Sequence, residues 1–280
     1  MISLDKVSKY YNQVPVVNEL TLDIPQGQMF GLLGPNGAGK STTIRILTTL
    51  THPSQGKVTV AGYDVVKQAP QVKRHIGVVL QQTSVDPDLT VWENMEYHGR
   101  LHHIPQPDRQ KLIQQWLEYV ELHDRQTVMV RTLSGGMKRR LQIARALVHQ
   151  PQILFMDEPT VGLDPQTRRR LWEIIRDLNG KGMTILLTTH YMAEAEFLCD
   201  RIGIMNSGQI IEMGSPDQLR EKYGKAVLIH QSPEGLVTKF FPDLTSAEAF
   251  LAQQPDKRGM MIRDSNLEDI FVELTGRQLD

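Results

Sequence analysis

The sequence has a single cysteine and no long apolar segment. One cysteine excludes an internal disulfide and fits a reducing compartment, and we expect Cys199 to be a small packed residue rather than a reactive thiol. No run of about 18 apolar residues occurs, so we expect no membrane-spanning helix. Residues 1–7 also lack the apolar core of a signal peptide.

The sequence also has no excess of positive or negative charge. The 31 Lys and Arg residues against 32 Asp and Glu residues leave a formal charge of −1, which favours neither nucleic acid nor anionic lipid as a partner. The two basic runs, residues 138–140 and 168–170, fall on expected helices, where neighbouring side chains point about 100° apart. We therefore predict solvated helix faces there rather than a basic patch.

Residues 34–41 read Gly-Pro-Asn-Gly-Ala-Gly-Lys-Ser and match the pattern of a phosphate-binding loop. The apolar segment 29–33 precedes the loop like a buried strand, and a helical apolar spacing follows it. Glycines let successive backbone N–H groups point at phosphate oxygens, and the helix adds its positive end. Lys40 would reach the β- and γ-phosphates, and the Ser41 hydroxyl would bind Mg²⁺.

A second motif is the apolar run 153–156, which ends in Asp157 and Glu158. A run that is apolar at every position predicts a central parallel strand, and ligands bind at the carboxyl ends of such strands. Asp157 would hold Mg²⁺ through water, while Glu158 would polarise the water that attacks the γ-phosphorus. The alternative is a strand that ends in a solvated acidic turn, and the phosphate loop makes that alternative weaker.

A third motif, Leu-Ser-Gly-Gly-Met at residues 133–137, stands at the start of an expected helix with Ser134 as its cap. Glycines inside a helix cost roughly 1 kcal/mol each, and close approach of a ligand to the backbone would explain them. From these residues alone, a flexible helix entry is the preferred interpretation.

With these three motifs and a later strand that ends at His190, the chain resembles the ATP-binding-cassette (ABC) ATPases over about its first 220 residues. The resemblance implies an α/β fold of the P-loop NTPase class with a parallel-sheet core, an antiparallel β-subdomain and an inserted helical subdomain. We assign the ATPase domain to residues 1–222, with the helical subdomain at about 86–150. Residues 223–280 would form a small α+β extension that packs on it.

The resemblance further implies a head-to-tail dimer with two ATP molecules between the copies. Ser134 and Gly136 of one cassette would complete the site formed by Gly39, Lys40 and Ser41 of the other. The second cassette would be an identical copy or a paralogue.

Other family positions are carried over one at a time. Tyr11, or its neighbour Tyr10, would stack on adenine. Gln81, rather than Gln82, would contact Mg²⁺ and the attacking water, and His190 would contact the γ-phosphate. The resemblance thus implies ATP and Mg²⁺ as cofactors. The catalytic residues would be Glu158, His190 and Gln81, and the metal-binding residues would be Ser41, Gln81 and Asp157. The nucleotide-binding residues would be Tyr11, Gly34, Pro35, Asn36, Gly37, Ala38, Gly39, Lys40, Ser41, Thr42, Ser134, Gly135, Gly136 and Asp164. Asp164 would also tune the dimer interface, a role compatible with its position before a proline in a turn.

Two features resemble exporter-type members of the family, of the drug-resistance kind. Met137 replaces the more common glutamine, and residues 266–276 resemble the tail of such exporter ATPases. The resemblance implies an ATP-hydrolysing motor on the cytoplasmic face of the membrane, coupled to a separate polytopic permease that docks near residues 86–90. The alternative is a soluble cassette ATPase that acts on ribosomes or DNA or as a regulator. The paired cassettes and long coiled coils typical of those members are not present in this sequence.

The remaining patterns predict the order of the elements. Residues 1–30 suggest antiparallel strands with a bend at 25–27, and 56–62 and 76–80 suggest further strands. Helices are clearest at 92–101 and 109–120, and a hairpin is expected at 202–205 and 210–213. Beyond residue 223 we expect strands at 226–230, 237–241 and 260–263 and helices at 246–253 and 267–274.

Overall fold

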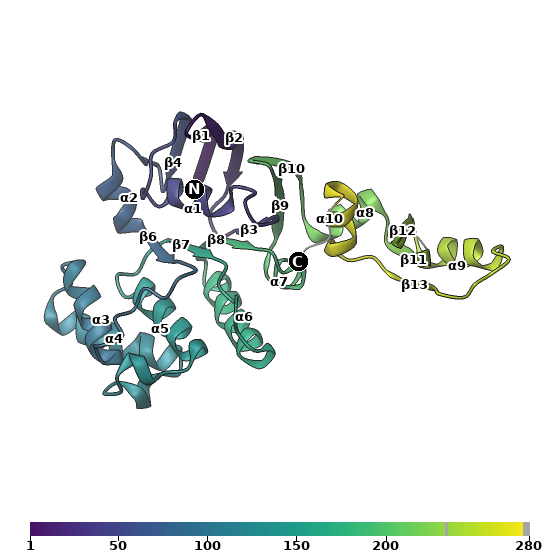
Figure 1. Ribbon diagram of the computed structural model, residues 1–280. Helices are drawn as coiled ribbons and strands as arrows, with labels where there is room; N and C mark the ends of the chain where they lie inside the picture. Colours follow the sequence, from purple (N-terminus) through teal and green to yellow (C-terminus); the bar gives the residue numbers. More distant parts are fainter. Residues whose placement is uncertain (233–234, 277–280) are drawn as a thin grey trace.

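The computed structural model describes residues 1–232 and 235–276, whose strands form three sheets (Figure 1). The first sheet is antiparallel and has the order β2-β1-β4-β5. Its strands are β1 (Ile2–Tyr11), β2 (Val14–Ile24), β4 (Gln55–Val60) and β5 (Tyr63–Asp64). The predicted antiparallel start of the chain is therefore confirmed for β1 and β2.

The second sheet has the order β10-β9-β3-β8-β7-β6 and is parallel except for β10, which pairs antiparallel with β9. Its strands are β3 (Met29–Leu33), β6 (Ile76–Val79), β7 (Ile153–Asp157), β8 (Thr184–Thr189), β9 (Arg201–Asn206) and β10 (Gln209–Gly214). The bend at residues 25–27 leads the chain into β3 of this sheet, so the expectation of antiparallel strands over residues 1–30 was wrong for residues 29–30, which pair in parallel with β8 and β9. β3 is buried at every position, which suits a central parallel strand and not an antiparallel edge.

The central strands carry apolar side chains on both faces. Phe30 and Phe155 point toward the antiparallel sheet and α1 (Lys40–Leu47), whereas Leu33, Met156 and Leu187 face the helices on the other side. Those helices include α6 (Pro165–Gly180) and α7 (Met192–Leu198). Each fully buried Phe or Leu side chain contributes about 1.5–3 kcal/mol of transfer free energy, so this double-faced burial fixes the strands whose ends form the site.

A mainly helical region lies between β6 and β7, below the sheets in Figure 1. After α2 (Ala69–His75) and β6 it contains α3 (Val91–Leu101), α4 (Gln106–Tyr119), two short 3₁₀ turns, η1 (His123–Arg125) and η2 (Val130–Thr132), and α5 (Gly135–Leu147). Thr90 and Glu93 form a capping box that starts α3. The region has its own apolar cluster, which includes Met95, Leu117 and Leu141.

The C-terminal part extends to the right in Figure 1. After α8 (Pro216–Tyr223), the strands β11 (Ala226–Ser232), β12 (Gly235–Phe241) and β13 (Met260–Asp264) form an antiparallel sheet, and α9 (Leu244–Ala252) packs on it. The last helix, α10 (Leu267–Thr275), packs against α7 and α8, and its Leu267, Ile270 and Phe271 enter the main core. The predicted order of strands and helices is confirmed here.

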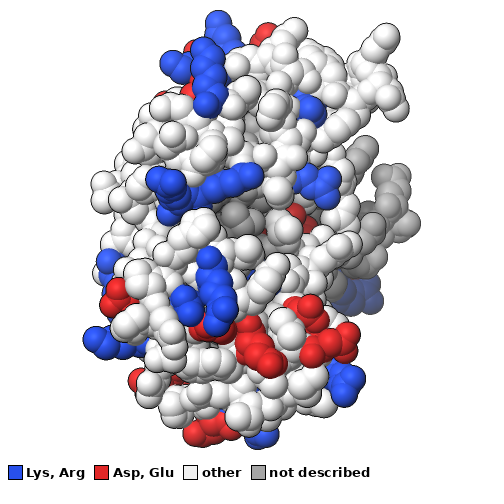
Figure 2. All heavy atoms as spheres, turned by 90° about the vertical axis from the view of Figure 1, so that its left-hand side faces the viewer, with Lys and Arg blue, Asp and Glu red and all other residues white. Residues whose placement is uncertain are grey.

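Lys and Arg side chains and Asp and Glu side chains both appear on the face shown in Figure 2, with acidic atoms most concentrated at the level of the helical region. Among the described residues, none of the helices combines the length and apolarity needed to span a membrane. Cys199 is buried, as predicted, and its sulfur would lie 2.6 Å from a Cβ on Gly31.

Candidate nucleotide site

The predicted phosphate loop connects β3 to α1 and surrounds a cavity of about 170 Å³. Gly37 and Gly39 have φ values of 81° and 106°, in the left-handed region that glycine adopts without strain. A Cβ on Gly39 would lie only 2.5 Å from the carbonyl oxygen of Val16. Gly39 caps α1 with no side-chain acceptor, so the first turn of the helix is free to bind an anion. The cavity is lined by Val16, Asn36, Gly37, Gly39, Lys40, Ser41, Thr42, Gln81 and Glu158.

Lys40 is the buried cation of the site, with 4% of its surface exposed. Its Nζ donates hydrogen bonds to the carbonyl oxygens of Gly34 at 2.7 Å and Pro35 at 3.1 Å, and it lies 3.7 Å from Oε1 of Glu158. Burial lowers the pKa of Lys40, and the charges of Glu158 and Asp157 oppose that shift. A phosphate that entered the cavity would provide this ammonium group with a stronger counter-charge than backbone carbonyls do.

Asp157 forms an oxygen cluster at the end of β7. Its Oδ1 accepts hydrogen bonds from Ser41 Oγ at 3.1 Å and from Thr188 Oγ1 at 2.5 Å. A buried carboxylate beside hydroxyls of the loop and of β8 is a set of hard oxygen donors, which Mg²⁺ prefers together with substrate phosphates. These residues therefore fit the metal that the sequence predicts there.

Glu158 is the centre of the polar contacts. Its Oε2 accepts a hydrogen bond from Gln81 Nε2 at 3.1 Å, and its Oε1 lies 3.3 Å from Nδ1 of His190, which makes no hydrogen bond within the described chain. The backbone of Glu158 has φ 47°, and its N–H donates to the carbonyl and hydroxyl oxygens of Thr188. A non-glycine residue in this region costs of order 1–3 kcal/mol, a strain that is typical of functional sites.

Arg139 holds the backbone behind Glu158. Its guanidinium donates to the carbonyl oxygens of Asp157, Glu158 and Pro159 and to that of Leu80, which precedes Gln81. Burial lowers the pKa of Arg139 to about 10. The prediction of a solvated helix face was therefore wrong for Arg139, because this side of α5 faces the ends of β6 and β7.

The Leu-Ser-Gly-Gly motif lies at the start of α5, where Ser134 Oγ accepts a hydrogen bond from the N–H of Met137 at 3.3 Å. Ser134 and Gly135 are exposed, whereas Gly136 packs on Thr167 of α6. Asp164 caps that neighbouring helix by accepting from the N–H of Thr167 at 2.9 Å. The motif and Asp164 thus share one surface, and neither lines the phosphate-loop cavity of its own chain.

The structure brings most, but not all, of the predicted site residues together. The loop residues meet Asp157, Glu158, Gln81 and His190 at one end of the parallel sheet. Tyr11 stands apart at the end of β1 with 44% of its surface exposed, and Lys9 Nζ lies 5.1 Å from its ring centre. Tyr10 is exposed as well, so the contacts within one chain do not decide between the two tyrosines.

Three residues at the site were not predicted: Val16, Thr188 and Arg139. Val16 lines the cavity from β2, and Thr188 binds both Asp157 and the backbone of Glu158. The position of Thr188 directly beside Asp157 in the sheet follows from the β7–β8 register. Its place two residues before His190 was the available signal in the sequence.

A phosphate loop between a parallel strand and a helix, with a buried Asp-Glu pair at the end of a neighbouring strand, defines a nucleotide hydrolase of the P-loop class. Residues 17–161 match the family described as ABC transporter. The chain belongs to this family, and it is an ATPase.

Relatives align over the full length. The chain is 40% identical to "Nod factor export ATP-binding protein I" of Cupriavidus pinatubonensis, an alignment that covers all of this chain and 92% of the relative. It is 36% identical to "Linearmycin resistance ATP-binding protein LnrL" of Bacillus subtilis, which covers all of this chain and 99% of that protein.

Solved structures agree in fold. An ATP-binding subunit of an ABC transporter has a TM-score of 0.76 and 25% identity, and the match covers 98% of this chain and 99% of that one. A dimeric ATP-binding cassette in a post-hydrolysis state, bound to ADP and Pi, has a TM-score of 0.70 and 29% identity. The match covers 77% of this chain and 98% of that cassette.

Proposed function

We propose that this chain is the ATP-hydrolysing motor of an exporter-type ABC transporter, bound to the cytoplasmic face of a membrane through a separate permease. The full-length similarity to proteins named for Nod factor export and linearmycin resistance supports export rather than import. The same similarity supports a permease on a separate chain, since both relatives are named as ATP-binding proteins of export or resistance systems. In the described chain, no helix is suited to cross the bilayer.

The observation that carries the proposal is the convergence of Gln81, His190 and Lys40 on the Glu158 carboxylate. In the proposed reaction, Lys40 and the loop N–H groups bind the phosphates of ATP, and Glu158 accepts the proton of the attacking water. Gln81 orients the carboxylate and that water, and His190 contacts the γ-phosphate. Glu158 is thereby held in place before ATP binds.

Ser41, Asp157 and Gln81 would hold Mg²⁺, which supplies charge neutralisation of the transferred phosphoryl group when bound. The chain's own contribution is to hold the carboxylate oxygens of Asp157 and Glu158 in fixed positions. Thr188 fixes Asp157 Oδ1, and Arg139 fixes the backbone of Asp157 and Glu158.

The site of one chain is incomplete in the proposed reaction. Ser134 and Gly135 are exposed at a helix start with free backbone N–H groups and lie outside their own chain's cavity. We propose that Ser134 and the backbone of Gly136, with Gly135 between them, contact the γ-phosphate bound by a second cassette, with Asp164 beside them at the interface. The dimeric cassette among the structural neighbours supports this arrangement. ATP would bridge such a dimer through its γ-phosphate, which ADP alone lacks, so we expect ATP to favour closure more than ADP does.

Replacing Glu158 with Gln tests the proposal. The amide keeps the size of the side chain but cannot accept the proton, so we expect ATP hydrolysis to fall by about 10²–10⁴-fold while ATP binding persists. Phosphate release and equilibrium binding of a fluorescent ATP analogue measure the two properties separately.

Lys40→Ala is the matched variant, because it should weaken ATP binding itself. Loss of a charge-assisted hydrogen bond costs about 1.5–3 kcal/mol, roughly 10–150-fold in affinity.

Normal ATP hydrolysis by the Glu158→Gln variant would show that Glu158 is not the catalytic base. Purification of the tagged chain with ribosomes, and not with a polytopic membrane protein, would contradict the proposed partner.

A further inference from the structure

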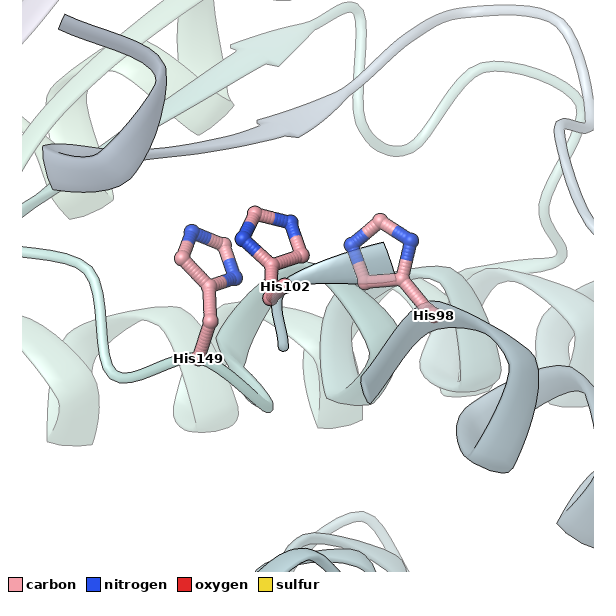
Figure 3. A group of neighbouring side chains, drawn as sticks. All are labelled: His98, His102 and His149. Atoms are coloured by element: carbon pink, nitrogen blue, oxygen red, sulfur yellow. The ribbon is translucent and has the colours of Figure 1, made fainter. Parts of the chain in front are cut away.

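A cluster of three histidines lies outside the nucleotide site, and nothing in the proposed reaction uses it. His98 lies in the last turn of α3, His102 caps the end of that helix, and His149 follows α5. Figure 3 shows all three rings projecting to the same side, with His102 between the other two. Their possible ligand nitrogens all lie within 4.8 Å of one another.

The backbone favours this convergence. His98 and His102 are four residues apart, a spacing that places two side chains on one face of a helix and that recurs in helical zinc sites. α3 and α5 share one apolar cluster that includes Met95, Ala144 and Val148, so the ends of the two helices are held together. The His102 and His149 rings stack with centres 3.7 Å apart, and the His98 ring lies 4.8 Å from that of His102.

His149 has the arrangement of a prepared metal ligand. Its Nε2 lies 2.9 Å from the carbonyl oxygen of Ile76 in β6, so this nitrogen carries the proton and donates it. The other nitrogen, Nδ1, then has a lone pair, and it is buried with no hydrogen-bond partner in the described chain. A second nitrogen bound to a backbone carbonyl is the usual way in which proteins orient a histidine toward a metal.

The surroundings keep the imidazoles uncharged. Burial lowers the pKa of His98 to about 3 and that of His149 to about 4, and it lowers the pKa of His102 as well. Arg145 is a cation near His98, but its guanidinium donates to the carbonyl and hydroxyl oxygens of Ser84. Without a carboxylate in the cluster, any ion must be held by neutral nitrogen ligands, which excludes Mg²⁺ and Ca²⁺ as preferred ions and favours zinc-like ions.

We propose that His98, His102 and His149 form a Zn²⁺ site that joins the end of α3 to the segment between α5 and β7. Zinc bound by three imidazoles keeps a fourth position open. That position would face the adjoining cavity of about 330 Å³, whose lining includes all three histidines as well as Leu80 and Ser84. Zn–N bonds of about 2.0–2.1 Å in a tetrahedral site place ligand nitrogens about 3.3 Å apart. The ligand nitrogens of the cluster lie within 4.8 Å of one another, and the His102 ring is stacked on that of His149, so zinc binding requires the His102 ring to turn out of the stack until its lone pair meets the ion.

Zinc binding to the untagged full-length chain, without nucleotide, tests the proposal. Competition with a chromophoric chelator should give one tight site, and millimolar Mg²⁺ should not displace the ion. Co²⁺ at the same site should give the visible absorption of tetrahedral coordination. Loss of even an outer-shell partner of a zinc ligand costs about 10–100-fold in affinity, so His149→Ala and His98→Ala should each lower the zinc affinity by at least about 100-fold.

His123→Ala is the matched control, because His123 is a histidine of the same helical region outside the cluster. It should bind zinc like the unaltered chain. His149→Ala also leaves the Ile76 carbonyl without its hydrogen-bond donor, so this variant could lose zinc by misfolding. His98→Ala removes a ligand without removing that bond, and it therefore separates loss of zinc from loss of structure. Circular dichroism and the ATPase rate without zinc report on folding. Zinc affinity unchanged in both cluster variants, or lost instead in His190→Ala, would overturn the proposal.

Discussion

Glu194 of α7 shows how a single buried charge affects this fold. Its Oε1 accepts hydrogen bonds from Thr160 Oγ1 at 2.7 Å and from Trp172 Nε1 at 2.9 Å, and the residue is fully buried. Burial raises the pKa of Glu194, although the hydrogen bonds from Thr160 and Trp172 oppose the shift. The ionised form is therefore less favourable in the folded chain than in the unfolded chain.

The sign of the pH effect follows from this shift. An unfolded glutamate ionises around its ordinary pKa of 4.5, before the folded one does. Stability is therefore lost as the pH rises from about 4.5 to the folded pKa, and the loss is complete above it. Glu194→Gln keeps Oε1 for Thr160 and Trp172 but cannot ionise. We expect it to be more stable than the unaltered chain at pH 8 and equal to it at pH 4, as measured by urea unfolding.

Glu194→Ala is the control for this prediction, because it removes the acceptor and leaves Thr160 and Trp172 without it. Unsatisfied buried donors cost about 1–3 kcal/mol, so this variant should be destabilised at both pH values. A Gln variant that is less stable at pH 8 would show that the folded chain favours the carboxylate charge.

Residues in sequence motifs were predictable, and residues that support them through the fold were not. Lys40, Asp157 and Glu158 each belong to a pattern with a chemical reason for its spacing. Arg139 and Thr188 do not, because their contacts arise where α5 and β8 meet the end of β7. Arginine on an amphipathic helix usually faces solvent, and only the packing of α5 reverses that expectation for Arg139.

At the scale of elements, α5 and α6 meet at Gly136. A Cβ at this position would lie 2.3 Å from Cγ2 of Thr167, whereas a Cβ on Gly135 would meet nothing within 4 Å. Gly136→Ala should therefore lower the free energy of unfolding by about 1–3 kcal/mol through overpacking. Gly135→Ala should be neutral or stabilising by up to about 1 kcal/mol, because alanine is the better helix former. Chemical denaturation compares the two directly.

A second variant removes the steric contact between the new Cβ at position 136 and Thr167. Thr167→Ser removes Cγ2 and keeps the backbone N–H that Asp164 caps. Adding Thr167→Ser to Gly136→Ala should restore most of the lost stability. Equal effects of the two alanine variants would mean that Gly136 is not needed for the close packing of α5 on α6.

Element order was predictable, but the pairing of strands was less so. The apolar run 29–33 predicted a buried strand and the run 153–156 a central one, and both strands are covered on both faces. The passage of the chain from β2 into a different sheet at residues 25–27 has no local signal, since a proline-glycine bend also suits a hairpin. Tertiary pairing with β8 and β9 decides it.

At the scale of the whole molecule, the helix α10 is part of the main core. Phe271 is fully buried there, and the backbone N–H of Leu267 donates to Oε1 of Glu196 on α7 at 2.9 Å. Phe271→Ala should destabilise the chain by about 3–5 kcal/mol and lower the main unfolding transition. Val237→Ala, at an exposed position of β12, should change it by no more than about 0.5 kcal/mol. If Phe271→Ala instead removed only a separate, minor unfolding transition and left the main one unchanged, the C-terminal part would fold independently.

The central claim also belongs to this scale: ATP is held between Lys40 of one cassette and Ser134 of another. The most direct measurement is a structure of the Glu158→Gln chain with ATP and Mg²⁺, where slow turnover preserves the bound state. The account predicts a head-to-tail pair with Ser134 Oγ of one copy within hydrogen-bond distance of the γ-phosphate bound at Lys40 of the other. Ser134 far from every nucleotide, in every assembly present, would contradict it.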